Sequence, residues 1–88
     1  MPPEVGKKVI ATVLSVQGEC ACGHKAGDKL QLSCYTPNGL CGFFYHDVFP
    51  YIQMLQFGGK FPDDWGGSVL EFACQDLVNV TRIQLRTE

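Results

Sequence analysis

The middle of the chain carries one run whose apolar residues recur with the period of a helix, and this run limits the folds open to the sequence. It extends from Leu40 to Phe57, ends at the stop signal Gly58-Gly59, and has its helix-spaced apolar residues at Phe44, Val48, Ile52 and Leu55. Pro50 lies inside the run and disfavours a helical conformation at the residue before it. We therefore expect one helical segment kinked at Pro50, or two short helices with Pro50 near the start of the second.

Stretches with the two-residue period of β-strands lie on both sides of this run. Lys8 to Val16 is rich in β-branched residues, whereas Asp28 to Cys34 and Val69 to Cys74 alternate between apolar and polar side chains. A last strand is expected from Val78 to Arg86, which gives the order β-β-α-β-β. The sequence thus predicts an α+β domain, in which a small, mostly antiparallel sheet packs on the Pro-kinked helical segment.

The alternation of the last expected strand contains a conflict. Val78 and Val80 share one parity, whereas Ile83 and Leu85 share the other. Because a strand cannot bury both sets against one core, we expect a β-bulge near Thr81-Arg82.

Length and charge narrow the classes of function. The chain has 88 residues, which corresponds to a single domain over residues 1–88. Its formal net charge is −2, without a basic stripe, which argues against a nucleic-acid partner or an anionic membrane surface. No stretch approaches the roughly 20 apolar residues that cross a bilayer, and no signal-peptide core follows the first residues. We therefore expect a cytoplasmic protein.

The residues best suited to chemistry are cysteines and one histidine. Cys20 and His24 lie on a glycine-rich loop, Cys41 lies where the helix is expected to begin, and Cys74 ends the third expected strand. Zinc takes about four sulfur or nitrogen ligands, and iron–sulfur clusters take thiolates. These four residues are therefore candidate ligands of zinc or an iron–sulfur cluster, and Cys22 can replace either loop ligand. The hypothesis requires distant segments to bring sulfur and imidazole to a common point.

The same thiols allow other interpretations. The number of cysteines, five, is odd, so at least one thiol stays free or pairs between chains. Cys34 alternates in phase with Leu30 and Leu32 and is expected to fill the core. A thiol-dependent enzyme or redox protein would use Cys41 or Cys20 as its nucleophile, since a helix N-terminus favours a thiolate at Cys41. No third catalytic member or oxyanion loop is evident in the sequence, so enzymatic activity stays open.

Aromatic residues are concentrated in the helical run. The stretch from Phe43 to Ile52 holds five aromatic side chains in ten residues, and one helix face cannot bury them all in a domain this small. Exposure of Tyr45, Phe49 or Tyr51 at a homo-oligomer interface is therefore expected, with a dimer as the simplest case. A non-catalytic interaction module is the third interpretation of the chain.

Four motifs follow one another along most of the chain: G-x-C-x-x-G-H-K-x-G-D, G-L-C, P-Y-I-x-x-L-x-F-G-G and C-x-D, at residues 18–28, 39–41, 50–59 and 74–76. In this combination the chain resembles a family of short prokaryotic proteins that are common in anaerobes and have no established activity. The resemblance singles out Cys20, His24, Cys41 and Cys74, and implies no reaction for them. Cys22 and Cys34 stand outside the pattern, and Gln75 stands where the family usually has Pro.

Overall fold

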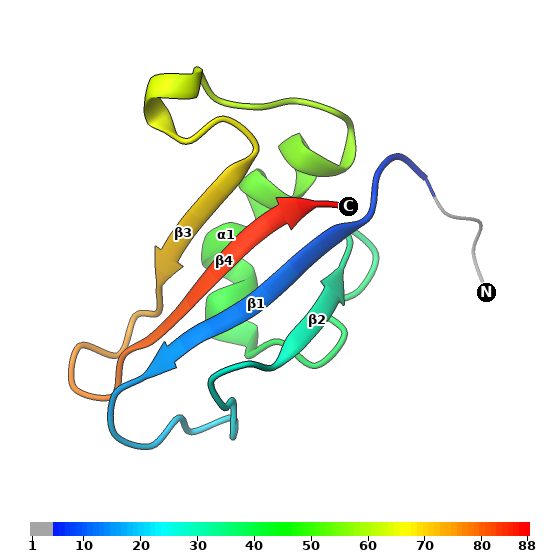
Figure 1. Cartoon of the computed structure of the whole chain (residues 1–88). Helices are drawn as coiled ribbons and strands as arrows, with labels where there is room; N and C mark the ends of the chain where they lie inside the picture. The colour runs from blue at the N-terminus through cyan, green and yellow to red at the C-terminus, as the bar shows by residue number, and fades with distance from the viewer. Residues whose placement is uncertain (1–4) are drawn as a thin grey trace.

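Figure 1 shows the fold in the computed structural model, which describes residues 5–88. Residues 1–4, part of the expected single domain, lie outside the described residues. One four-stranded sheet has the strand order β2-β1-β4-β3, and its neighbouring strands are antiparallel. The elements in chain order are β1 (Val9–Val16), β2 (Lys29–Leu32), helix α1 (Gly42–Gln56), the 3-10 helix η1 (Asp63–Trp65), β3 (Val69–Ala73) and β4 (Thr81–Thr87). The predicted α+β class and its order of strands and helix are confirmed.

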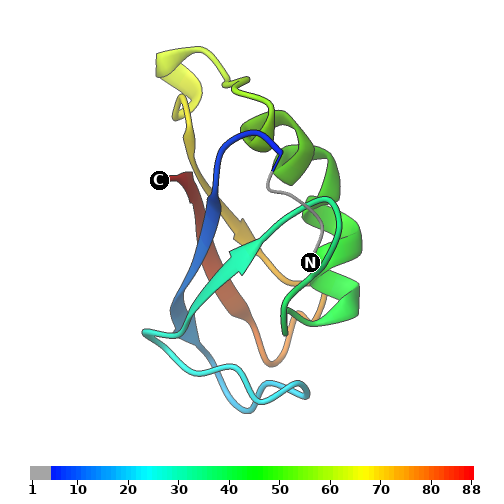
Figure 2. The same ribbon diagram turned by 90° about the vertical axis from the view of Figure 1, so that its right-hand side faces the viewer.

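The helix covers one face of the sheet, and the core lies between these two layers (Figure 2). α1 contacts the two central strands, β1 and β4. Its buried residues include the four predicted from helical spacing: Phe44, Val48, Ile52 and Leu55. The strands meet them with the buried side chains of Val9, Ala11, Val13, Leu32, Leu70, Ile83 and Leu85. Removal of this apolar surface from water holds the layers together.

The helix runs without interruption across Pro50. Proline has no N–H, so the carbonyl of His46 loses its partner four residues on. Buried residues on both sides of Pro50 hold the two halves of α1 against the same sheet. The alternative of two short helices is therefore wrong, whereas the kink at Pro50 stays a prediction.

A bulge does occur in the sheet, but it lies in β1. The register of β1 against β4 shifts between Val13 and Ser15, which leaves Leu14 as the extra residue. The shift changes the parity of the strand, so Val16 packs against the core after Val13 has done so. This parity change explains why Val16 faces the core although it has the opposite parity to Val9, Ala11 and Val13.

The expected bulge in the last strand is wrong. β4 begins only at Thr81, so Val78 and Val80 lie before the strand. They therefore do not have to follow its alternation of buried and exposed side chains. From there the alternation is regular, with Thr81, Ile83 and Leu85 buried.

A buried amide joins the end of α1 to two other segments. Gln56 is only 2% exposed, and its Oε1 accepts the backbone N–H of Cys34 at 2.8 Å. Its Nε2 donates to the carbonyl of Val5 at 2.9 Å. The Gln56 carbonyl in turn accepts the N–H of Lys7. These bonds fix the segment before β1 and the turn after β2 to the last turn of the helix.

Candidate functional site

One cavity is enclosed by the loop after β1, the start of α1 and the segment after β3, which lie at the same end of the sheet (Figure 1). Its volume is about 290 Å³. The cavity is lined by four of the five cysteines and one histidine, namely Cys20, Cys22, His24, Cys41 and Cys74. The rest of the wall includes Phe43, Phe44, Gln75, Asp76, Asn79 and Thr81. The candidate residues from distant segments therefore share one cavity.

Tight turns shape the loop that carries three of these residues. The N–H of Gly23 donates to the carbonyl of Cys20 at 2.9 Å, and Gly23 has a φ of +78°, which favours glycine. The carboxylate of Asp28 accepts the N–H of Lys25 at 2.9 Å. The chain thus turns twice between β1 and β2, and Cys20, Cys22 and His24 come to lie along one wall.

Cys20 is surrounded by groups that favour its thiolate. Burial has the largest single effect and raises the pKa of the thiol. The Thr81 hydroxyl and the backbone N–H groups of His24, Cys22 and Gly23 act against burial and bring the Cys20 pKa below its ordinary value of 9.0. Cys20 is therefore the thiol most ready to ionise among those with a shifted pKa.

Thr81 carries a buried hydroxyl whose hydrogen bonding is incomplete. The residue is 1% exposed, and its Oγ1 has no partner with full hydrogen-bond geometry within residues 5–88. Its hydroxyl lines the cavity and acts on the Cys20 sulfur. The hydroxyl therefore meets the Cys20 sulfur at a geometry short of a full hydrogen bond, which costs free energy at a buried position.

The sulfur of Cys74 has its own donor. The backbone N–H of Thr81 donates to Cys74 Sγ at 3.2 Å, and the thiol lies 3.7 Å from the carbonyl oxygens of Asp76 and Asn79. The segment between β3 and β4 therefore wraps around this sulfur. Side-chain packing of Cys74 against the core fixes it further.

An aspartate organises the same segment. Asp76 Oδ1 accepts the N–H groups of Val78 and Asn79, both at 2.9 Å, and these bonds hold the pKa of its carboxyl below the ordinary value. Asn79 Oδ1 accepts the N–H of Glu19 at 3.2 Å. The turn that holds Cys74 is thereby tied to the loop that holds Cys20.

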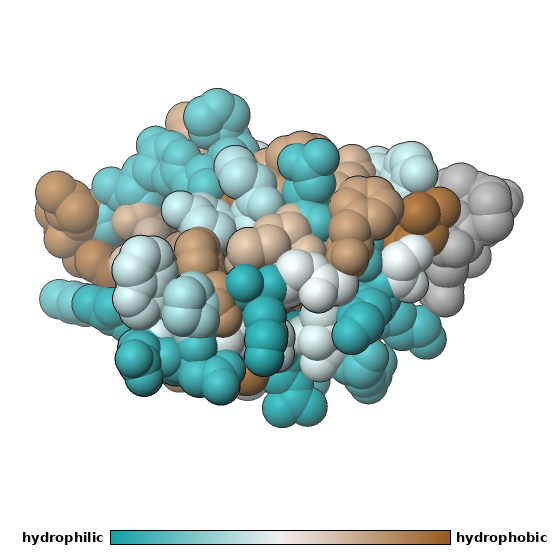
Figure 3. Space-filling model, turned by 90° about the horizontal axis from the view of Figure 1, so that it is seen from above, coloured by the Kyte–Doolittle hydropathy of each residue, from teal (hydrophilic) through white to brown (hydrophobic). Residues whose placement is uncertain are grey.

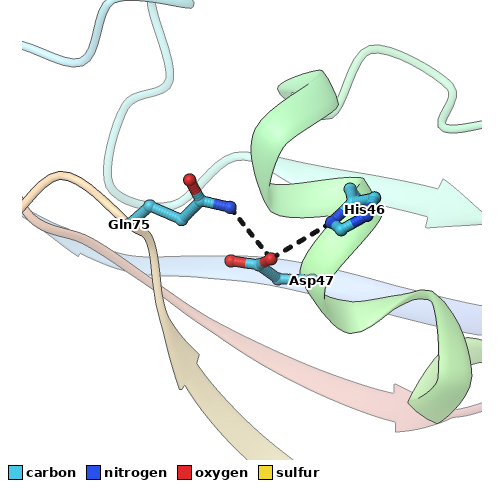
Figure 4. Close-up of polar contacts among 3 residues, drawn as sticks. All are labelled: His46, Asp47 and Gln75. Carbon is cyan, nitrogen blue, oxygen red and sulfur yellow. Dashed lines mark hydrogen bonds and ion pairs between the residues drawn. The ribbon is translucent and has the colours of Figure 1, made fainter.

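A second tie joins this segment to the helix, as Figure 4 shows. Gln75 Nε2 donates to Asp47 Oδ1 at 2.9 Å, and the same oxygen lies 3.3 Å from Nδ1 of the exposed His46. The contact spans from the residue after Cys74 to the second turn of α1. It fixes two walls of the cavity relative to each other.

Cys22 and Cys41 both line the cavity, Cys22 from the loop after β1 and Cys41 from the position before α1. The neighbouring Cys41 thiol is the main cause that raises the pKa of Cys22 to about 11, and burial and the charges of Cys41 and Cys20 act in the same direction. Cys22 therefore keeps its proton at neutral pH. Cys41 is half-buried, whereas Cys22 is exposed at the mouth.

His24 is buried, and its ring accepts a hydrogen bond from the backbone. Nε2 accepts the N–H of Cys41, the residue before α1, at 3.1 Å. An imidazole nitrogen that accepts this bond carries no proton, so the proton of the neutral ring lies on Nδ1. With Nε2 engaged, His24 positions Cys41, and its role as a metal ligand stays a prediction.

The cavity does not hold a ready-made metal centre. Among residues 5–88, no three His, Cys, Asp or Glu side chains are arranged so that they could hold a metal ion as they stand. Cys34, the remaining cysteine, lies outside the cavity and packs against the core, as its alternation predicted. Burial raises the pKa of the Cys34 thiol.

The aromatic residues expected at an interface are half-buried and have partners within the chain. The rings of Tyr45 and Phe49 pack edge to face at 5.5 Å, and Tyr45 donates its hydroxyl proton to the carbonyl of Ser33. Tyr51 packs against Phe72 with ring centres 4.7 Å apart. On the face seen in Figure 3, hydrophobic side chains lie in patches between hydrophilic ones. The homo-oligomer stays a prediction.

Two residues of the site have no role in the sequence-based hypothesis. Thr81 acts on two of the thiols, and its only sequence signal is its inward parity with Ile83 and Leu85. Asp76 belongs to the C-x-D motif, but a motif does not reveal that the carboxylate binds the backbone of its own turn.

No family model, curated protein or solved structure matches this chain. In the part of the chain that the structure describes, no helix has the length and apolar character needed to cross a membrane. The resemblance to the prokaryotic family therefore stays a prediction, and the cavity itself carries the functional argument.

Proposed function

We propose that this protein binds a thiophilic metal, a zinc ion or an iron–sulfur cluster, through the thiolates of Cys20, Cys22, Cys41 and Cys74. The observation that carries the proposal is the convergence of four cysteines, from three separate segments, on one cavity of about 290 Å³. Tetrahedral sulfur sites suit zinc and iron–sulfur clusters alike.

The donors around the sulfurs support this proposal. Cys20 has backbone N–H groups and a hydroxyl beside it, and Cys74 accepts an N–H bond at 3.2 Å. Hydrogen bonds to ligating sulfurs orient them and tune the metal, so such donors belong to the outer shell of a thiolate centre. For the half-buried Cys34, which packs against the core, no donor to the sulfur is found within residues 5–88.

The repulsion between neighbouring thiolates also supports the proposal that the cavity binds a metal. The charges of Cys41 and Cys20 add to the raised pKa of Cys22, so neighbouring thiolates in the cavity disfavour one another. A bound cation reverses this effect, because it stabilises each thiolate that surrounds it. Metal binding is therefore coupled to release of thiol protons and to a shift of the sulfurs toward one point.

The proposed ligands differ from the set expected from sequence, which had His24 in place of Cys22. His24 Nε2 already accepts the N–H of Cys41, whereas the Cys22 thiol lines the same cavity as the other three sulfurs. We therefore assign His24 a positioning role and Cys22 a ligating role.

The test begins with protein purified without oxygen. Elemental analysis is expected to find zinc or iron in near-stoichiometric amount, and the reduced, metal-stripped protein is expected to give a thiolate-to-metal absorption band with Co²⁺. Cys34→Ser, the matched control outside the cavity, keeps the metal, whereas Cys20→Ser and Cys74→Ser weaken binding by about tenfold or more. Retention of no metal together with no cobalt band would overturn the proposal.

The ligand set has its own readout. The cobalt band per bound ion is expected to shrink in Cys22→Ser, because one thiolate is lost. In His24→Ala the affinity falls, but the band per ion is unchanged, because the number of sulfurs stays the same. The opposite result would restore His24 as a ligand.

A thiol nucleophile at Cys20 is the second candidate, favoured by the lowered pKa of that thiol. It predicts that iodoacetamide at neutral pH modifies Cys20 first in protein as purified. A metal centre instead protects all four cavity thiols from alkylation, while Cys34 reacts equally with and without metal.

A further inference from the structure

A second cavity lies beside β3 and the loop that precedes this strand. Its volume is about 390 Å³, and four aromatic side chains line it, those of Tyr51, Phe61, Trp65 and Phe72. The cysteine cavity lies at the opposite end of β3, where Cys74 follows the strand (Figure 1). The two cavities share no lining residue, so they are separate sites.

The four rings form a continuous row. The ring centres of Trp65 and Phe61 are 5.9 Å apart, those of Phe61 and Tyr51 are also 5.9 Å apart, and Tyr51 follows Phe72 at 4.7 Å. Successive ring planes are tilted by 40°, 45° and 38°, so the rings do not close into a flat stack. Each ring has a negative face, and several rings around one space attract a cation more strongly than one ring does.

Trp65 belongs to this row but not to the hydrophobic core. Its residue is 71% exposed, whereas the other three rings pack against the core. Backbone hydrogen bonds nevertheless fix the loop that carries it. The N–H groups of Trp65 and Gly67 donate to the carbonyl of Pro62 at 2.8 and 3.2 Å, and the N–H of Phe61 donates to the carbonyl of Gly67 at 3.0 Å. The indole is therefore held beside the cavity by its loop and is accessible to a ligand.

The charges around the cavity favour a cation. Residues 61–72 include three acidic side chains, Asp63, Asp64 and Glu71, and no lysine or arginine. Glu71 is the one charged residue that lines the cavity, and within residues 5–88 it forms no ion pair. The nearest lysine in the sequence, Lys60, lies outside the lining and is paired with Asp63 at 3.5 Å. The aromatic rings add a preference for a cation with an apolar surface.

We propose that this aromatic cavity binds a trimethylammonium group. Such a group spreads its positive charge over methyl groups and donates no N–H bond, so it suits ring faces better than a lysine ammonium does. A free ion such as choline and a trimethylated lysine side chain both carry the group. The site uses none of the cysteines, so this inference does not depend on the proposed metal centre.

The first experiment uses Trp65 as its own reporter, because it is the single tryptophan of the chain. Choline, added to the full chain at constant ionic strength, is expected to change the tryptophan fluorescence in a saturable way. The neutral compound 3,3-dimethyl-1-butanol has nearly the same shape, with carbon in place of the charged nitrogen. It is expected to bind more weakly by about fivefold or more, because it has no cation–π attraction. Equal affinities would mean a plain apolar cavity and would overturn the proposal.

Variants test whether the rings hold the ion. In NMR titrations of the full chain, Trp65→Leu is expected to weaken choline binding by about fivefold or more, and its position outside the core spares the fold. Phe57→Leu is the matched control, since Phe57 is 60% exposed and lines neither cavity. This control is expected to bind choline as the parent does. Equal weakening in the two variants would overturn the proposal.

A third titration identifies the source of the group. A short peptide that carries trimethyllysine is compared with choline, and with the same peptide that carries unmodified lysine. Whichever of choline and the trimethylated peptide binds more tightly is assigned as the natural class of ligand, and the unmodified peptide is expected to bind about fivefold more weakly than its trimethylated form. A fluorescence change that is not saturable with choline or with the trimethylated peptide would overturn the site itself.

Discussion

At the scale of single residues, Thr81 shows a conflict between stability and chemistry. Its buried hydroxyl has no partner of full hydrogen-bond geometry in the described chain, yet it favours the thiolate of Cys20. A valine would have nearly the same shape and no polar group to leave unsatisfied. The hydroxyl is therefore retained at a cost in folding free energy.

Thr81→Val is expected to leave the metal-free protein as stable as the parent or more stable by about 1 kcal/mol, because it removes a buried hydroxyl that has no partner of full hydrogen-bond geometry. Denaturant unfolding of the two proteins measures this difference. Thr81→Ser keeps the hydroxyl and is expected to lose stability, since it removes a buried methyl group. A clear loss of stability in the valine variant would show that the contact of Oγ1 with the Cys20 sulfur is a full hydrogen bond.

The reactivity of Cys20 gives a pH-dependent prediction. Because its pKa is lowered, the rate of alkylation at Cys20 is expected to rise with pH at a midpoint below 9.0. In Thr81→Val one of the groups that lower the pKa is lost, so the midpoint moves upward. Rates measured by mass spectrometry in a Cys22→Ser background isolate Cys20, and an unmoved midpoint would contradict the role of Thr81.

At the scale of elements, Gln56 acts as a junction. The end of α1, the turn after β2 and the segment before β1 all bond to this one residue. Its amide satisfies the backbone N–H of Cys34 and the carbonyl of Val5 through part-buried hydrogen bonds. Loss of the amide leaves both groups without partners, which is the costly way to break a buried hydrogen bond.

Gln56→Leu is therefore expected to destabilise the protein by roughly 1–3 kcal/mol in denaturant unfolding. Gln53→Leu makes the same chemical change at an exposed position of the same helix and is expected to alter stability by about 0.5 kcal/mol or less. Equal effects of the two variants would show that the junction contributes nothing beyond side-chain size.

The elements also show what the sequence can predict. Helical spacing identified the buried face of α1, since Phe44, Val48, Ile52 and Leu55 all face the sheet. The bulge was placed in the wrong strand, because parity within one strand does not reveal which partner carries the extra residue. The hydrogen bond from the Cys41 N–H to His24 Nε2 is also beyond what the sequence predicts, since it depends on how a glycine-rich loop folds over the start of a helix.

At the scale of the whole molecule, strand order explains why distant cysteines meet. β1 and β3 are both antiparallel to β4, so they run in the same direction, and the segments that follow them leave at the same end of the sheet. The first of these segments carries Cys20 and Cys22, the second begins at Cys74, and α1 starts beside both. Alternation in the sequence gives the strands but not their order, so the convergence was a hypothesis until the topology was known.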